Sequence, residues 1–230
     1  MDESSEDTGA IQVPSSWRPL VEDTTLITLF LDLYAAASPP LSCTALDCLV
    51  RLASVRRSLF SGEPQRQAFV ATLVQSTLRV LETSQGLGDH DNYHNFCRLL
   101  GRLKTNYQLG EIVAVDCYPE WIALVAKLTV SSLQSWQWAA ASIFYLLGLW
   151  SRLVSSVPYL KGDRPSLLDR FVPDIVEGYV QSRLESVAAV LGGAVLEDPL
   201  DSEEQIAEQM ETLPFLFRFQ ASAGADLAGA

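Results

Sequence analysis

Apolar residues recur every three or four positions along most of this chain, which is the spacing of one face of an α-helix. The clearest case is residues 91–110, where large side chains occupy such positions: Tyr93, Phe96, Leu100, Leu103 and Tyr107. Asp91 can accept hydrogen bonds from the first free amides, and Gly110 can end the helix in the left-handed conformation. We therefore expect one amphipathic helix whose apolar stripe is covered by neighbours.

The same periodicity predicts seven further helices, over residues 24–37, 41–60, 64–85, 119–134, 139–156, 167–190 and 201–213. Pro39 and Pro40 separate the first two, and we expect a kink near Pro173 in the seventh of these. Residues 111–118, EIVAVDCY, are apolar enough to suggest a strand. Because no partner strand is predicted elsewhere, we expect them to form a packed connection between helices.

Short connections between consecutive helices predict antiparallel neighbours. The first helices of successive pairs open near residues 24, 64, 119 and 167. These spacings of 40, 55 and 48 residues straddle the ~40 to 47-residue period of two-helix HEAT-type repeats. We therefore predict an all-α fold, a HEAT-like α-solenoid of about four antiparallel helical hairpins over residues 17–213. An irregular helical bundle would have the same helix count. Residues 1–16 are expected to be an acidic disordered leader, and residues 214–230 a disordered tail.

The formal net charge of −12 comes almost entirely from two segments. These segments contain no basic residue, and their carboxylates are Asp2, Glu3, Glu6, Asp7, Glu197, Asp198, Asp201, Glu203, Glu204, Glu208 and Glu211. The rest of the chain is therefore close to neutral. It offers no basic stripe able to neutralise a run of phosphates, so nucleic-acid binding is not expected.

One group of basic residues falls on two helices that would be the second members of adjacent hairpins: Arg51, Arg56, Arg57, Arg98, Arg102 and Lys104. In a right-handed HEAT stack the second helices line the concave face, where protein partners dock. We therefore treat these six residues as a candidate partner-binding site. The alternative is an ordinary solvated face of cations at i, i+4 spacing.

The only cluster that resembles a metal site is Asp89, His90, Asp91 and His94. No third ligand is indicated at a fixed spacing, and Asp91 is wanted as a helix cap, so we expect capping with solvated imidazoles. A metal-dependent enzyme at His90 and His94 is a weaker alternative. The chain has no GxSxG, no P-loop and no GxGxxG before a helix, so we expect no catalytic residue, no cofactor and no enzyme.

Cysteine and aromatic residues suggest core positions rather than chemistry. The four cysteines, Cys43, Cys48, Cys97 and Cys117, form no CxxC pair, and we expect buried reduced thiols in a reducing intracellular compartment. Most of the five tryptophans fall in or beside apolar helices. The most apolar stretch, residues 138–150, meets Arg152 before it reaches the ~20 residues that span a bilayer, so we expect a core helix and no membrane insertion.

Several runs carry a resemblance to a known family: SWRPL (16–20), LFLDLY (29–34), LASVRRSLF (52–60), NYHNFCRLLGRLKTNYQLGE (92–111), YLLGLWSRLVSSVPY (145–159), SRLESV (182–187) and LEDPLD (196–201). In this order they resemble an internal portion of an exportin-type nuclear transport receptor of the importin-β superfamily, over residues 2–201. That family is built of HEAT repeats and binds Ran in its GTP form. The resemblance implies transport of protein cargo through the nuclear pore.

The resemblance also implies partners and a location. Ran and cargo proteins are the expected partners, with nucleoporins as further candidates, and the expected location is the nucleus and the cytoplasm. A complete receptor of this family is several times longer, and the N-terminal repeats that mainly grip Ran are absent here, so we expect a fragment or a truncated product. The tail matches nothing in the family. A stand-alone helical-repeat scaffold without Ran dependence is the alternative. A stack cut at both ends should expose apolar faces and self-associate.

Overall fold

The computed structural model describes residues 11, 13–161 and 164–193. Within that part of the chain the long helices are α2 (Thr25–Ala36), α3 (Leu41–Ala53), α4 (Glu63–Thr83), α5 (His90–Asn106), α7 (Tyr118–Gln134), α8 (Trp136–Ser156) and α9 (Val172–Leu191). The short helices are α1 (Arg18–Glu22) and α6 (Leu109–Val113), with single 3-10 turns at Ser15–Trp17, Arg57–Leu59, Val157–Tyr159 and Leu168–Arg170. The expected helix at 201–213, the tail, and residues 1–10 and 12 of the leader lie outside the described residues.

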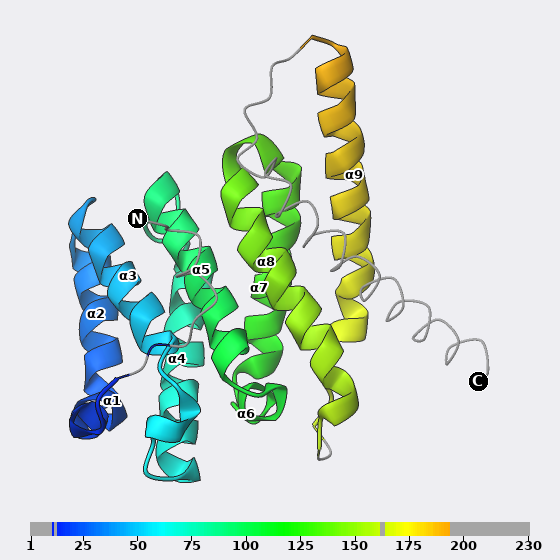
Figure 1. Cartoon of the computed structure of the whole chain (residues 1–230). Helices are drawn as coiled ribbons and strands as arrows, with labels where there is room; N and C mark the ends of the chain where they lie inside the picture. Colours follow the sequence, from blue (N-terminus) through cyan, green and yellow to red (C-terminus); the bar gives the residue numbers. More distant parts are fainter. Residues whose placement is uncertain (1–10, 12, 162–163, 194–230) are drawn as a thin grey trace.

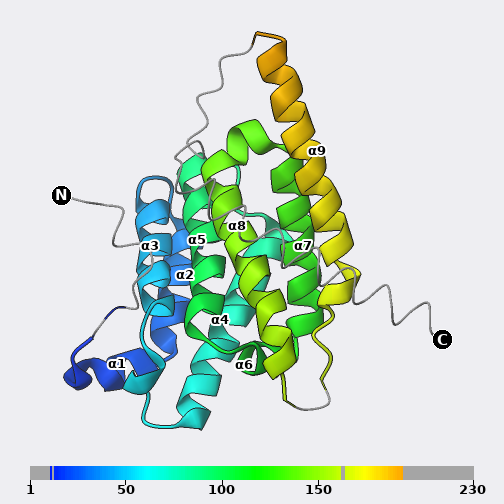
Figure 2. The same cartoon turned by 45° about the vertical axis from the view of Figure 1, so that its right-hand side comes forward.

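The helices form two layers (Figure 1). Helices α2, α4, α7 and α9 pack side by side in the first layer, and α3, α5 and α8 pack side by side in the second. Consecutive helices α2 and α3, and likewise α7 and α8, pack against each other across the layers, and the turned view shows the same order (Figure 2). The predicted all-α stack of hairpins is therefore confirmed. Of the fourth expected hairpin, the described residues contain only the first helix, α9.

The helix expected over residues 41–60 is shorter than predicted. It ends at Ala53, because the Ser54 carbonyl accepts from the Ile11 backbone N–H at 2.9 Å and Val55 forms an isolated parallel bridge with Ile11. These backbone groups are satisfied by a distant segment instead of a further helical turn. Arg56 and Arg57 therefore lie beyond the helix on which they were expected.

The helix expected over residues 91–110 is also bounded differently. Its N-cap is Asp89, not Asp91, and the Asp89 carboxylate accepts from the Asn92 backbone N–H at 3.0 Å. Helix α5 ends at Asn106, so Gly110 is not its stop but lies inside α6. The Glu111 carboxylate accepts from the Gln108 backbone N–H at 2.8 Å and helps to start this short helix.

Two smaller expectations meet different outcomes. Residues 111–118 contain the end of α6 and turns, so the prediction of a packed connection rather than a strand is confirmed. The kink expected near Pro173 is wrong. Pro173 is the second residue of α9, a position where its missing N–H removes no intrahelical hydrogen bond.

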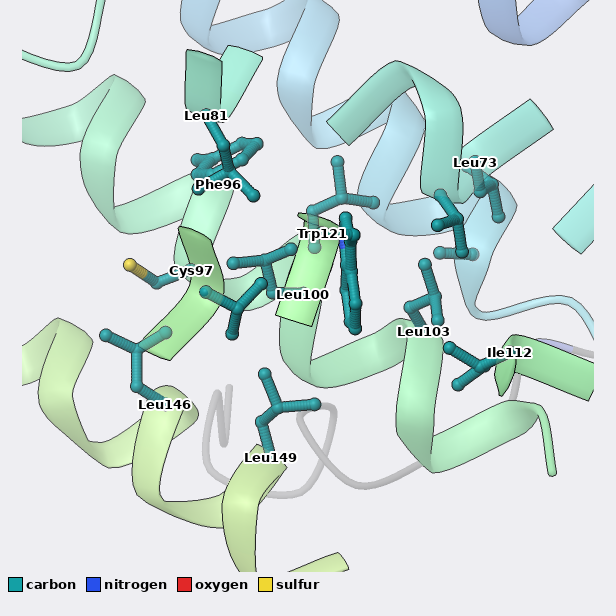
Figure 3. Packing of buried hydrophobic residues seen from close by; sticks show 14 of the residues in the cluster. Leu73, Leu81, Phe96, Cys97, Leu100, Leu103, Ile112, Trp121, Leu146 and Leu149 are labelled. Atoms are coloured by element: carbon teal, nitrogen blue, oxygen red, sulfur yellow. The ribbon is translucent and has the colours of Figure 1, made fainter. Parts of the chain in front are cut away.

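The core lies between the layers and is densest around α5. All five residues of its predicted apolar stripe are buried, and Figure 3 shows Leu100 and Leu103 beside Trp121 of α7. At Gly101, α5 lies close to α8, because a Cβ there would be in van der Waals contact with the Tyr145 carbonyl oxygen at 3.5 Å. The stripe thus fills the space between three neighbouring helices.

Two buried tryptophans are each tied to a threonine on a neighbouring helix. The Trp121 indole of α7 donates to the Thr77 hydroxyl of α4, and the Trp150 indole of α8 donates to the Thr129 hydroxyl of α7, both at 2.9 Å. Both indole rings are fully buried. A buried N–H needs an acceptor, so the first bond fixes how two adjacent hairpins meet and the second fixes how α7 and α8 pack within one hairpin.

Segment Trp136–Tyr159 is long and apolar enough to cross a membrane when judged by length and composition alone. Half of its most apolar window is buried inside the protein, where α8 packs against α5 and α7. This packing agrees with the core-helix prediction.

Replacing either acceptor should destabilise the fold. Thr77→Val and Thr129→Val keep the side-chain shape but leave a buried indole N–H unpaired, so each should lower the free energy of unfolding by about 1–3 kcal/mol. Thr72→Val is the matched control, because Thr72 is only half-buried on α4 and its hydroxyl donates to the Ala68 carbonyl of its own helix. Urea unfolding followed by tryptophan fluorescence measures all three. Equal stability of the three variants would contradict this role of the threonines.

Large exposed hydrophobic residues gather at the two ends of the described stack. They include Leu20, Leu29 and Leu33 at one end and Val180, Leu184, Val187 and Leu191 on α9, whereas between α3 and α9 the described residues add only Trp138 and Tyr159. The chain should therefore self-associate at micromolar concentration. Light scattering of the native chain should show a mean mass above the 25.3 kDa of one chain. The double change Leu184→Glu with Val187→Glu should lower this mean mass, whereas the control Gln181→Glu should leave it unchanged. A purely monomeric native chain would contradict this expectation.

Candidate functional site

The two layers carry opposite charge. The second-layer helices α3, α5 and α8 have more basic than acidic residues, namely Arg51, Arg98, Arg102, Lys104 and Arg152 against Asp47 and Asp91. The long first-layer helices have the reverse, namely Arg66, Arg79, Lys127 and Arg183 against Asp32, Glu63, Glu82, Glu120, Asp174, Glu177 and Glu185. The candidate cations therefore lie on or beside the electropositive layer.

Arg51 of α3 and Arg98 of α5 share one carboxylate. Arg51 Nε lies 2.8 Å from Asp47 Oδ2, and Arg98 Nη1 lies 3.6 Å from Asp47 Oδ1. Arg98 also donates to the Asn95 amide oxygen at 2.8 Å. Arg51 is exposed and Arg98 is half-buried. This cluster joins two adjacent helices at the surface.

Arg57 belongs to a second cluster, centred on Glu111 at the start of α6. Arg57 Nη2 lies 3.2 Å from Glu111 Oε1, and Arg66 of α4 donates to the same oxygen. Glu111 is largely buried, so this carboxylate is a structural hub. The sequence interpretation missed it, because Gln108 is not a usual N-cap residue even though Glu111 lies at the capping-box spacing from it. Arg56, beside Arg57, is exposed.

Arg102 and Lys104 are buried, which contradicts the expectation that these cations lie on an open face. Loss of hydration and, to a smaller extent, the nearby Arg152 guanidinium lower the pKa of Lys104 to about 8, although Glu111 opposes the shift. From the sequence, Arg152 was noted only because it interrupts an apolar stretch, and it was not included among the candidate cations. Hairpin alternation places it on the same layer as Lys104.

A groove of about 720 Å³ runs beside the end of α5 and collects three cations. Its lining includes Arg57, Lys104 and Lys161, together with Tyr107 and the exposed Tyr159. The structure thus brings Arg51 together with Arg98, and Arg57 together with Lys104. The groove therefore combines cationic side chains with aromatic and aliphatic lining residues.

The histidines serve helix packing. His90 Nε2 lies 3.1 Å from the Trp138 carbonyl oxygen, and His94 Nδ1 lies 3.4 Å from the Ser142 hydroxyl, so both rings contact α8. His94 is half-buried, not solvated as expected. Within the described residues no group of three or more His, Cys, Asp or Glu side chains is arranged to hold a metal ion.

The four cysteines are free thiols. Cys97 is fully buried in α5, and burial raises its pKa far above the ordinary value. Cys43, Cys48 and Cys117 are half-buried, so the expectation of burial holds fully only for Cys97.

Lys104→Met should stabilise the protein in a pH-dependent way. The folded pKa of about 8 lies below the usual 10.5, so the folded state resists protonation and the penalty is complete below pH 8. The variant should therefore be more stable by about 1–3 kcal/mol at pH 7, and the advantage should shrink as the pH rises towards 10.5. Urea unfolding of both proteins at pH 7 and pH 9.5 measures the difference. An unchanged advantage at both pH values would show that Lys104 is not the group responsible.

Comparison with protein-family models and with solved structures gave no match. Comparison with curated proteins did. The chain is 49% identical over 217 residues to Exportin-7-A of Xenopus laevis and 46% identical over 217 residues to Ran-binding protein 16 of Drosophila melanogaster. It is 48% identical over 212 residues to Ran-binding protein 17 of Homo sapiens. These alignments cover 92–94% of this chain but only 19–20% of each relative. Nearly the whole chain is therefore similar to one fifth of an exportin-7 or Ran-binding protein, which confirms the resemblance to exportin-type receptors.

Proposed function

We propose that this chain acts as part of an exportin-type nuclear transport receptor. The observation that carries the proposal is the 46–49% identity, over 94% of the chain, to proteins named as exportin-7 and as a Ran-binding protein. The two-layered stack of helical hairpins supports it, because such stacks offer extended surfaces for protein partners. On this proposal the chain shuttles between nucleus and cytoplasm and supplies repeat surface for Ran, for cargo and for nucleoporins. It performs no chemistry of its own.

The surface proposed to meet partners is the electropositive layer. Arg51, Arg56, Arg57 and Arg98 keep part of their side chains at the surface, whereas Arg102 and Lys104 are buried and support the fold. A partner with acidic side chains would gain charge-assisted hydrogen bonds there. The alternative function is a stand-alone helical-repeat scaffold that binds protein without regard to Ran.

Pull-down with purified Ran tests the proposal. The chain and a full-length relative are each immobilised and offered Ran loaded with GTP or with GDP. We expect both to retain more Ran-GTP than Ran-GDP, with weaker retention by the chain because it spans only a fifth of the relative. Arg51→Glu with Arg56→Glu should reduce retention at least threefold, since rim charges govern association. Arg79→Glu on the first layer is the matched control.

The outcomes separate the two functions. The receptor proposal is supported if the chain retains more Ran-GTP than Ran-GDP. The proposed surface is supported if the Arg51 and Arg56 changes reduce that retention. Absent or nucleotide-independent binding by this chain, alongside normal binding by the full-length relative, leaves only the scaffold function for the chain.

A further inference from the structure

Three elements end around the groove that contains Arg57, Lys104 and Lys161. Lys104 lies in the last turn of α5, Arg57 opens the 3-10 turn that follows α3, and Lys161 follows the 3-10 turn after α8. The ends of α5 and α8 and the short helix α6 lie at the same end of the stack in both views (Figures 1 and 2). The charged side chains that line the groove are all basic, and its volume of about 720 Å³ is far larger than one ion needs.

The Lys104 ammonium is largely buried, and it forms no ion pair within the described part of the chain. Its electrostatic neighbours are Arg152, which repels it, and Glu111. Glu111 is already shared, because one of its oxygens contacts Arg57 at 3.2 Å and accepts from Arg66, and the other accepts from a backbone N–H. The charges around Lys104 therefore leave a surplus of positive charge in a poorly hydrated place, which is costly without a counter-ion.

Arg57 has a donor that the described residues do not use. Its Nη2 contacts Glu111, but its Nε is buried and has no hydrogen-bond partner among the described residues. Buried N–H groups normally have an acceptor, so an orphan on a residue that lines a groove indicates a place for one. The Arg57 side chain is 34% exposed, so the guanidinium can turn to offer its free donors to an incoming group.

The chemistry of the two cations favours a phosphate group over a carboxylate. A phosphate monoester carries about −2 charge and three strong acceptor oxygens at pH 7, so one such group can bind an arginine and a lysine at once. A carboxylate supplies one charge and would leave the second cation uncompensated. The lining also includes Leu109, Leu160 and the exposed Tyr159, which give the rest of a peptide an apolar surface.

We propose that this groove binds a phosphorylated side chain of a protein segment, with the phosphate held between Arg57 and Lys104 and with Lys161 beside it. The occupant is a phosphorylated peptide rather than a free ion, because the groove is larger than a phosphate and partly apolar. The site requires no Ran and stands apart from the receptor proposal.

Isothermal titration calorimetry of the full chain, in a buffer without phosphate, tests the site. The probe is an end-blocked peptide, Ala-Ala-phosphoserine-Ala-Ala, and two comparison peptides carry serine or glutamate at the central position. Inorganic phosphate is titrated separately. The test variants are Lys104→Met, which removes a buried charge, and Lys161→Met, which changes an exposed side chain and leaves the fold intact. Lys127→Met is the matched control, because Lys127 is exposed on α7 and lies outside the groove.

We expect the phosphoserine peptide to bind about tenfold more tightly than either comparison peptide and than inorganic phosphate. Lys104→Met should weaken its binding about fivefold and Lys161→Met about twofold, because an exposed charge contributes less, and Lys127→Met should have no effect. Equally tight binding of the glutamate peptide overturns the preference for phosphate. Equally tight binding of inorganic phosphate overturns the peptide as occupant. Equal affinity of the Lys104→Met and Lys127→Met variants overturns the placement of the site.

The pH dependence gives a second readout of Lys104. Its pKa is lowered to about 8, chiefly by loss of hydration and further by Arg152, so it is charged at pH 7 and largely neutral at pH 9.5. A phosphate monoester, with a second pKa of about 6, remains dianionic over this range. The native chain should therefore bind the phosphoserine peptide several-fold more weakly at pH 9.5. The other titratable groups that face Lys104 or line the groove are Arg57, Tyr107, Glu111, Arg152, Tyr159 and Lys161.

Lys104→Met should abolish this pH dependence. A pH dependence that survives the change assigns it to another of these groups and overturns the contact between Lys104 and the phosphate.

Discussion

Burial of α5 is the constraint on which the described structure depends. This helix lies between α3 and α8 with the first layer behind it, and Leu100, Leu103 and Phe96 are fully buried. Contact with α8 is close enough that Gly101 faces the Tyr145 backbone. Dispersion and hydrophobic burial favour this close approach, but they leave little room for hydrated groups on the flanks of the helix. Arg102 and Lys104 are drawn inside for that reason, and the cost is visible as the lowered pKa of Lys104.

The apolar periodicity alone was sufficient to predict the long helices and their order, because each has to hide one stripe of its own surface. It could not predict several helix ends, because those ends depend on distant residues. Helix α3 stops at Ala53 where Ile11 takes the next carbonyl, and Gly110 fails to stop α5 because Glu111 starts another helix with Arg57 and Arg66 around it. Misplacing the cap at Asp91 instead of Asp89 is a smaller error, since both can accept from early amides.

The candidate surface was predictable only as a layer. Alternation of helices in hairpins is enough to place Arg51 and Arg98 on the same side, and the structure brings them to one carboxylate. The burial of each cation depends on the register between neighbouring helices. The spacing of residues within one helix does not determine that register. The shared roles of Asp47 and Glu111 are invisible in sequence for the same reason, since their partners lie on other elements.

These shared carboxylates limit how the electropositive layer can bind anything. A partner carboxylate that approaches Arg98 has to compete with Asp47, and one that approaches Arg57 has to compete with the largely buried Glu111. An exposed ion pair typically contributes less than about 1 kcal/mol to the free energy of binding, and salt screening reduces that contribution further. Charge alone therefore cannot hold a protein partner there. Affinity must come from apolar contact beside the charges, and the groove that joins Arg57 to Tyr107 and the exposed Tyr159 is where the described residues offer both. If acidic partners bind this layer as proposed, its charge would select and orient them, while the aromatic residues would supply the area that retains them.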